Sequence, residues 1–182
     1  SLPHTQEGNI LSIILKQGKS QTEIQETDQK VQETVKSIIN DVAKRGEAAV
    51  RELSIKFDNW NPESFRLSQE QIDKIVASVP ETVKEDIRFA QEQIRRFAQH
   101  QKEALRDLEV ETLPGVILGH RNIPVNSVGC YVPGGRYPMV ASAHMSILTA
   151  KVAGVKRVAA CTPPIKGEIP AATVYAMAMA GA

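Results

Sequence analysis

Apolar residues recur three or four positions apart through the first part of the chain, the spacing typical of amphipathic helices. The first such pattern, in residues 31–42, follows Asp28 and precedes Gly46, a residue suited to end or kink a helix. A second, shorter pattern covers residues 49–57 and ends at turn-forming residues 58–62. Residues 1–26 lack this periodicity, and we expect an extended arm there, with one short helix around residues 10–16.

The pattern predicts two further helices. Ser68 and Gln71 form a capping-box pattern at the start of the third helix, and Pro80 ends it. The fourth helix is the longest and is expected over residues 81–105. Its predicted apolar seam consists of Val83, Ile87, Ala90, Ile94, Phe97 and Ala98. Each helix has one apolar stripe, so the helices are expected to pack into a small bundle.

Beyond residue 108 the pattern changes to short apolar runs separated by turn residues. Pro114 and Gly115 lie between the runs 109–113 and 116–120, which predicts a hairpin. Strands are expected at residues 127–132 and 157–161, and helices at 142–153 and 170–180. Strands alternating with helices indicate an α/β fold: an N-terminal helical segment followed by the first part of a doubly wound, Rossmann-like parallel sheet.

These patterns divide the chain into an N-terminal arm (1–26), a helical segment (27–107) and a partial nucleotide-binding α/β domain (108–182). The predicted sheet is incomplete, because two parallel strands and a hairpin cannot bury the apolar faces of the helices beside them. A small α/β enzyme complete at 182 residues is a further alternative, and the open sheet edge argues against it.

Composition narrows the classes of partner. Hydrophobic residues make up 42% and charged residues 24% of the chain, the profile of a soluble globular protein. Its 22 basic and 21 acidic residues create no net field, so neither nucleic acid nor a membrane surface is an expected partner. Apolar runs are too short to cross a membrane. Cys130 and Cys161 lie in strand-like runs and are expected to be buried free thiols in a reducing cytoplasm.

Residues 133–138, Pro-Gly-Gly-Arg-Tyr-Pro, follow a predicted strand, where ligands bind in doubly wound sheets. Gly134 and Gly135 permit a positive φ and a close approach of a ligand to the backbone, and Arg136 suits an anionic group. The motif is neither G-x-G-x-x-G nor a P-loop, and a plain tight turn is the alternative. Thr162, after the second strand, has the alternatives of donating to a ligand or forming a local turn bond.

Catalytic and metal-binding patterns are not recognisable in this chain. The histidines His4, His100, His120 and His144 show no metal-ligand spacing, and no Ser-His-Asp order or H-E-x-x-H motif occurs. His144 lies near the start of the helix after the glycine turn, and it either faces a substrate or is a helix-surface or partly buried residue. We therefore predict no catalytic residue and no metal ligand within the chain.

Several motifs, in order, resemble one family. The segment VGCYVPGGRYPMVASAHMSILTAKVAGVKRVAACTPP is similar to a conserved part of histidinol dehydrogenases, and VAKRGEAAVRELSIKFD resembles their early helical stretch. The resemblance covers residues 28–182. It implies a cytosolic, homodimeric, zinc- and NAD-dependent dehydrogenase that oxidises an alcohol through an aldehyde to a carboxylic acid.

The resemblance also assigns site residues. By motif position Tyr131 corresponds to a tyrosine that contacts NAD, so Tyr131, Gly134 and Gly135 are the predicted cofactor-binding residues. Family members are well over twice this length, and their zinc ligands and Glu-His acid/base pair come later, so these are expected outside this chain.

The chain departs from the family pattern after the glycines. Arg136-Tyr137-Pro138 and His144-Met145 replace small, apolar residues and a Leu-Met pair, and this variant is similar to sulfopropanediol 3-dehydrogenases. The resemblance therefore implies a small-molecule substrate that is histidinol or a sulfonated diol. The alternative function is a truncated, non-catalytic paralogue that acts as a binding or dimerisation module.

Overall fold

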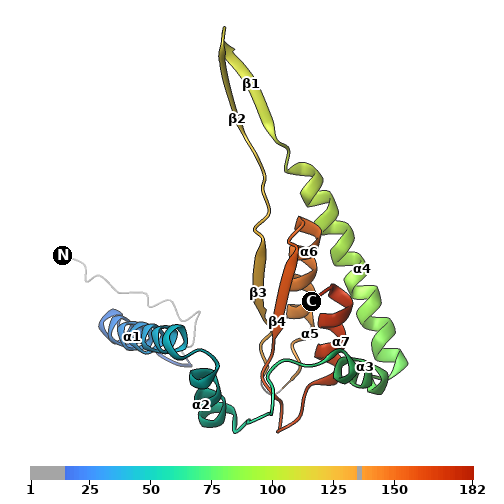
Figure 1. Ribbon diagram of the computed structural model, residues 1–182. Coiled ribbons are helices and arrows are strands. Elements are labelled where there is room, and N and C mark those ends of the chain that lie inside the picture. The colour runs from blue at the N-terminus through green and yellow to red at the C-terminus, as the bar shows by residue number, and fades with distance from the viewer. Residues whose placement is uncertain (1–14, 135–136) are drawn as a thin grey trace, which may run out of the picture. The chain divides into compact units, whose positions relative to one another are not determined.

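The computed structural model describes residues 15–134 and 137–182. It divides into two compact units, Ser1–Glu52 and Leu53–Ala182 (Figure 1). The predicted change of composition at residue 108 lies inside the second unit and does not coincide with this division.

The first unit contains α1 (Gln21–Arg45) and the start of α2 (Glu47–Asp58). The prediction of an extended arm through residue 26 is wrong for its last part, because Ser20 and Glu23 form a capping box that starts α1 at Gln21. Residues 10–14 of the predicted short helix lie outside the described residues, and Leu15 and Lys16 form a bend.

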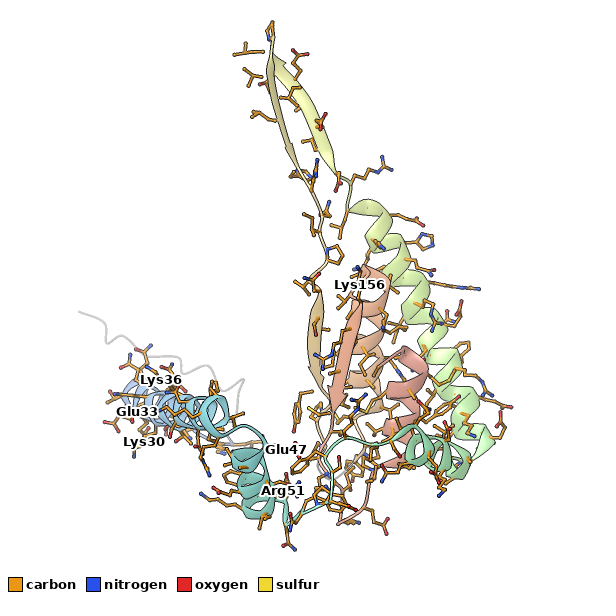
Figure 2. All side chains as sticks on the ribbon, in the orientation of Figure 1. Lys30, Glu33, Lys36, Glu47, Arg51 and Lys156 are labelled. Carbon is orange, nitrogen blue, oxygen red and sulfur yellow. The ribbon has the colours of Figure 1, made fainter. Side chains whose placement is uncertain are left out.

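Charged side chains cover the helices of this unit. Lys30, Glu33 and Lys36 are exposed along α1, and on α2 Arg51 pairs with Glu47 at 3.4 Å (Figure 2). Gly46 ends α1 with a φ of +60°, as its place in the pattern predicted. This polar surface explains why apolar periodicity does not indicate a helix at the start of α1.

The helices α3 (Gln69–Ser78) and α4 (Glu81–Ala104) belong to the second unit. The capping box of Ser68 and Gln71 is confirmed, with both of its hydrogen bonds present. The predicted seam of α4 is wrong at Phe97, which is 67% exposed. The polar Gln91 is instead almost completely buried among the seam residues.

The predicted hairpin is confirmed. Strands β1 (Leu108–Leu113) and β2 (Val116–His120) pair antiparallel around Gly115, whose φ is +83°. All residues of both strands are exposed.

The α/β part alternates strands and helices as predicted. Its elements are β3 (Ser127–Tyr131), α5 (Val140–Ala143), η1 (His144–Leu148), α6 (Thr149–Ala153), β4 (Arg157–Cys161) and α7 (Ala171–Ala180). Strands β3 and β4 pair in parallel from Ser127 beside Arg157 to Tyr131 beside Cys161. The predicted fold class, helices followed by parallel strands, is confirmed. The helix after β3 contains an unpredicted π-helical segment, η1, and Pro170 caps α7 instead of being its first residue.

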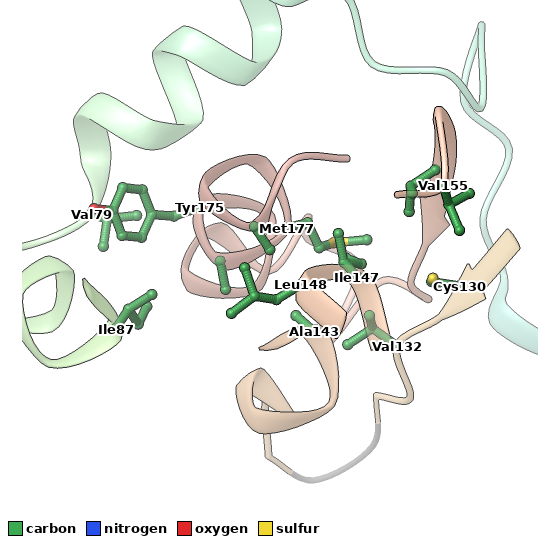
Figure 3. Close-up of a cluster of buried hydrophobic side chains, with 13 residues drawn as sticks. Val79, Ile87, Cys130, Val132, Ala143, Ile147, Leu148, Val155, Tyr175 and Met177 are labelled. Carbon is green, nitrogen blue, oxygen red and sulfur yellow. The ribbon is translucent and has the colours of Figure 1, made fainter. Parts of the chain in front are cut away.

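One hydrophobic core joins α3, α4 and the α/β elements. Ile87 of α4, Ile147 of η1 and Tyr175 of α7 are among its buried side chains (Figure 3). Helix α7 is almost wholly apolar and contributes several buried residues, because helices pack around more than one of its sides. Helices α3 and α4 therefore support the sheet and the helices beside it.

The sheet of β3 and β4 has one covered face and one open face. Residues 128, 130, 158 and 160 turn toward the core, whereas residues 127, 129, 131, 157, 159 and 161 are exposed. Parallel sheets normally carry helices on both faces. Within the described residues of the second unit, helices cover only one face, in agreement with an incomplete doubly wound sheet.

Candidate functional site

The candidate site lies at the carboxyl ends of β3 and β4, which meet at one edge because the strands are parallel. The backbone N–H of Val132 donates to the carbonyl of Cys161 at 2.8 Å and continues the ladder beyond Tyr131. Val132 is fully buried in the core. The chain therefore leaves β3 in a fixed direction.

Tyr131 is the aromatic residue at this edge. Strand alternation places its side chain on the open face of the sheet, where it is 64% exposed. A ring of this kind offers a flat surface to another ring. Tyr131 therefore does not fill the core.

The glycine turn is held against the loop after β4. A methyl group added at Gly134 would lie 2.8 Å from Cγ of Pro163 and 3.7 Å from Cγ1 of Ile165. The φ of Gly134 is outside the left-handed region, so this glycine is required by the close approach of Pro163 and not by a positive φ. Gly135 and Arg136 lie outside the described residues.

Thr162 bonds across the two loops. Its hydroxyl donates to the carbonyl oxygen of Val132 at 2.8 Å, so it forms neither a local turn bond nor a bond aimed at a ligand. Sequence reasoning missed this partner because 30 residues separate the two positions.

His144 lies in the core and not at the strand ends. It is 4% exposed, and its Nδ1 is 3.1 Å from Nε2 of Gln91, which also donates to the carbonyl of Ala176 at 2.9 Å. The amide nitrogen of Gln91 thus donates to both acceptors. His144 must therefore be the neutral tautomer that carries its proton on its own Nε2. His144 is a structural residue that ties η1 to α4 and, through Gln91, to α7.

This environment predicts a pH dependence of stability. Burial lowers the pKa of His144 below its ordinary value of about 6.5. The unfolded chain therefore takes up the proton first as pH falls, and stability is lost from about pH 6.5 downward until the folded-state pKa is passed. We expect the Tm to fall as the pH is lowered from about 7.5 to about 5. Carboxylates usually titrate below this range, at about pH 4. His144→Gln, which does not titrate, is the matched variant; an equal fall of its Tm would contradict this prediction.

The two cysteines differ. Cys130 is a buried free thiol, as predicted, whereas Cys161 is exposed, so the prediction of burial is wrong there. The reason is the alternation along β4, which turns Cys161 toward the open face of the sheet.

The remaining described histidines lie on the surface of their elements. His100 is 3.3 Å from Glu103 within α4, and Nε2 of His120 is 2.9 Å from the carbonyl oxygen of Arg106. Within residues 15–134 and 137–182, the side chains of His, Cys, Asp and Glu form no cluster that could hold a metal ion. The described helices also include none that is long and apolar enough to cross a membrane.

Comparison with known proteins shows the family to which this chain belongs. The family model described as histidinol dehydrogenase matches residues 21–182. The chain belongs to the histidinol dehydrogenase family. The resemblance inferred from the motifs is thus confirmed.

Members of the histidinol dehydrogenase family with high similarity include two bacterial proteins. A histidinol dehydrogenase homolog of Shouchella clausii is 70% identical over 168 residues, which cover 92% of this chain and 40% of the relative. The sulfopropanediol 3-dehydrogenase of Ruegeria pomeroyi is 49% identical over 153 residues, or 84% of this chain and 35% of the relative. The chain thus spans about two fifths or less of the length of these relatives.

The fold agrees with a solved member of the family. The crystal structure of histidinol dehydrogenase from Elizabethkingia anophelis matches with a TM-score of 0.72 and 25% identity, over 92% of this chain and 36% of that one. The described helices and parallel strands therefore have the same arrangement as the corresponding part of this solved structure.

Proposed function

We propose that this chain is the N-terminal part of a zinc- and NAD-dependent dehydrogenase that oxidises an alcohol through an aldehyde to a carboxylic acid. Family membership supports the class of reaction, and the smaller length of the chain than of its relatives supports the assignment to one part. The observation that carries a cofactor role for this part is the exposed Tyr131 beside the interlocked strand-end loops.

The substrate is histidinol or a sulfonated diol such as sulfopropanediol. The relative named sulfopropanediol 3-dehydrogenase, 49% identical, supports the second alternative. The arginine at position 136 would suit a sulfonate, and it lies outside the described residues. The protein would act on this small molecule as a cytoplasmic homodimer.

The strand ends have the chemistry to hold NAD. When bound, NAD would supply a hydride acceptor, and the two successive oxidations would use two NAD molecules, one after the other. Tyr131 would stack on one of its flat rings, while the turn at Gly134 and Gly135 would form the adjacent wall of the cleft. Because glycine has no side chain, a dinucleotide could approach the backbone closely here.

Zinc does not fit the described residues, because they contain no group of ligands for it. Its ligands and the acid/base pair would belong to the remainder of the protein. We therefore expect no turnover of histidinol or sulfopropanediol by these 182 residues alone, measured as NADH formation. Turnover by this chain would contradict the proposal that the zinc ligands and the acid/base pair belong to the remainder of the protein.

Titration of the 15N-labelled chain with NAD tests the proposed cofactor site. We expect weak binding, with a Kd of about 1 mM, because the opposite wall of the cleft is supplied by the rest of the protein. Backbone amide shifts should change at Tyr131, Val132, Gly134 and Thr162 but not in the hairpin at residues 108–120. Shifts confined to other regions, or none at 10 mM NAD, an amount about ten times this Kd, would refute the site.

Tyr131→Ala should weaken NAD binding by up to about tenfold, since loss of an aromatic stacking partner removes about 0.5–1.5 kcal/mol. Tyr131→Phe should retain the affinity within about twofold, because stacking needs the ring and not the hydroxyl. Phe97→Ala, which removes an aromatic ring of similar exposure from α4, is the control. An unchanged Kd in Tyr131→Ala would contradict a contact between this ring and NAD.

A further inference from the structure

We infer that Thr162 is a positioning residue, which holds Val132 and the nearby Gly134 in the arrangement that receives NAD. This inference rests on the proposed cofactor site. It concerns a residue that lies on the neighbouring loop, one position beyond the end of β4.

The first observation concerns the hydrogen bond made by the peptide group between Val132 and Pro133. Pro133 has no backbone N–H, so the carbonyl of Val132 is the only polar group of this peptide. The Thr162 hydroxyl donates to it at 2.8 Å. On its other side, Val132 donates its N–H to Cys161 at 2.8 Å. Both polar backbone groups of a fully buried residue are therefore held by the consecutive residues 161 and 162.

The second observation is a contact one residue further along the loop after β4 and two residues further along the turn after β3. Pro163 lies so close to Gly134 that a Cβ there would be 2.8 Å from its Cγ and 3.5 Å from its Cδ. The proline ring has a fixed φ and cannot turn away as a flexible side chain would. The hydrogen bond at Val132 and the packing at Gly134 thus join the two loops at successive points.

The loop that carries Thr162 is itself ordered. Ile165 and Glu168 exchange two backbone hydrogen bonds, of 2.9 and 3.0 Å, across Lys166 and Gly167. Both turn residues have a positive φ, +51° and +74°. This closed turn supports Ile165, which also faces Gly134. Gly134 therefore rests against a loop that is closed by two backbone hydrogen bonds.

These contacts have a consequence for the binding surface. The direction of the chain after Tyr131 sets where its ring and the following turn lie relative to each other. If the Val132 carbonyl loses its donor, we expect it to rotate toward water, and Pro133 to move with it because its φ is fixed. Thr162 would therefore affect NAD affinity without touching NAD.

The test compares Thr162→Val, which keeps the shape and removes the hydroxyl, with Thr162→Ser, which keeps the hydroxyl. Thr149→Val is the matched control, because the Thr149 hydroxyl also donates to a backbone carbonyl, that of Met145, within one helix and away from the strand ends. Two readouts apply to each chain: hydrogen exchange of the Val132 and Gly134 amides, and the Kd for NAD from amide shifts.

In Thr162→Val we expect exchange at Val132 to be about fivefold faster and NAD binding about fivefold weaker, the effect of one hydrogen bond. Thr162→Ser and Thr149→Val should stay within about twofold of the wild-type chain in both readouts. Unchanged exchange, or faster exchange with an unchanged Kd, would overturn the positioning role of Thr162. If the wild-type chain itself gives no response to NAD, the proposed cofactor site fails as well, and this outcome is distinct from the first two.

Discussion

Replacing Gln91 with methionine is expected to lower the free energy of unfolding by about 3 kcal/mol, because two buried acceptors lose their donor. Gln91 is 1% exposed, and its Nε2 donates to the carbonyl of Ala176 and to Nδ1 of His144. Methionine has a similar length and flexibility, so packing changes little. Urea unfolding followed by circular dichroism measures the loss.

Gln93→Met is the matched control for this prediction. Gln93 is on the same helix, α4, and is exposed, so its replacement should change stability by less than about 0.5 kcal/mol. A loss below about 1 kcal/mol in Gln91→Met would mean that the carbonyl of Ala176 and His144 find other partners at little cost. The interpretation of His144 as a structural residue would then lose its main support.

Helices and strands were predicted well from the sequence where the hydrophobic periodicity agreed with a capping or turn residue at the boundary. Ser68 with Gln71 marked the start of α3, Pro114-Gly115 marked the hairpin, and Gly46 marked the end of α1. At these positions a local physical requirement, a cap or a turn, fixes the boundary. The parallel pairing of β3 and β4 followed from the alternation of strands and helices alone.

Sequence reasoning failed where a polar residue acts locally or a polar pair is formed over a long distance. Ser20 and Glu23 start α1 in a polar stretch, and the absence of apolar periodicity hid the capping box. Gln91 and His144 are 53 residues apart, and no local pattern shows that each satisfies the other in the core. Phe97 fits the heptad spacing, yet Ala98 takes the buried position one residue later.

The candidate site was predictable in position but not in construction. Tyr131 and the glycine turn follow from the rule that ligands bind beyond the carboxyl ends of parallel strands. The roles of Thr162 and Pro163 depend on which residues of the two strands lie side by side. A shift by one residue in the pairing of β3 and β4 would have brought other side chains to Val132 and Gly134.

Substituting alanine at Gly134 is expected to destabilise the chain by about 2 kcal/mol, the cost of overpacking a filled position. The added methyl group would lie 2.8 Å from Cγ of Pro163, so either the proline or the turn must shift. Gly129→Ala is the control in the same strand region, because a Cβ at Gly129 meets nothing within 4 Å. That variant should be as stable as the wild-type chain or more so, since alanine loses less conformational freedom than glycine on folding. Equal urea midpoints for the two variants would show that Pro163 yields without cost, and the two loops would then not be held by their packing. If instead Gly134→Ala is destabilised and also binds NAD more weakly, the same contact both closes the core at this edge and shapes the cofactor surface.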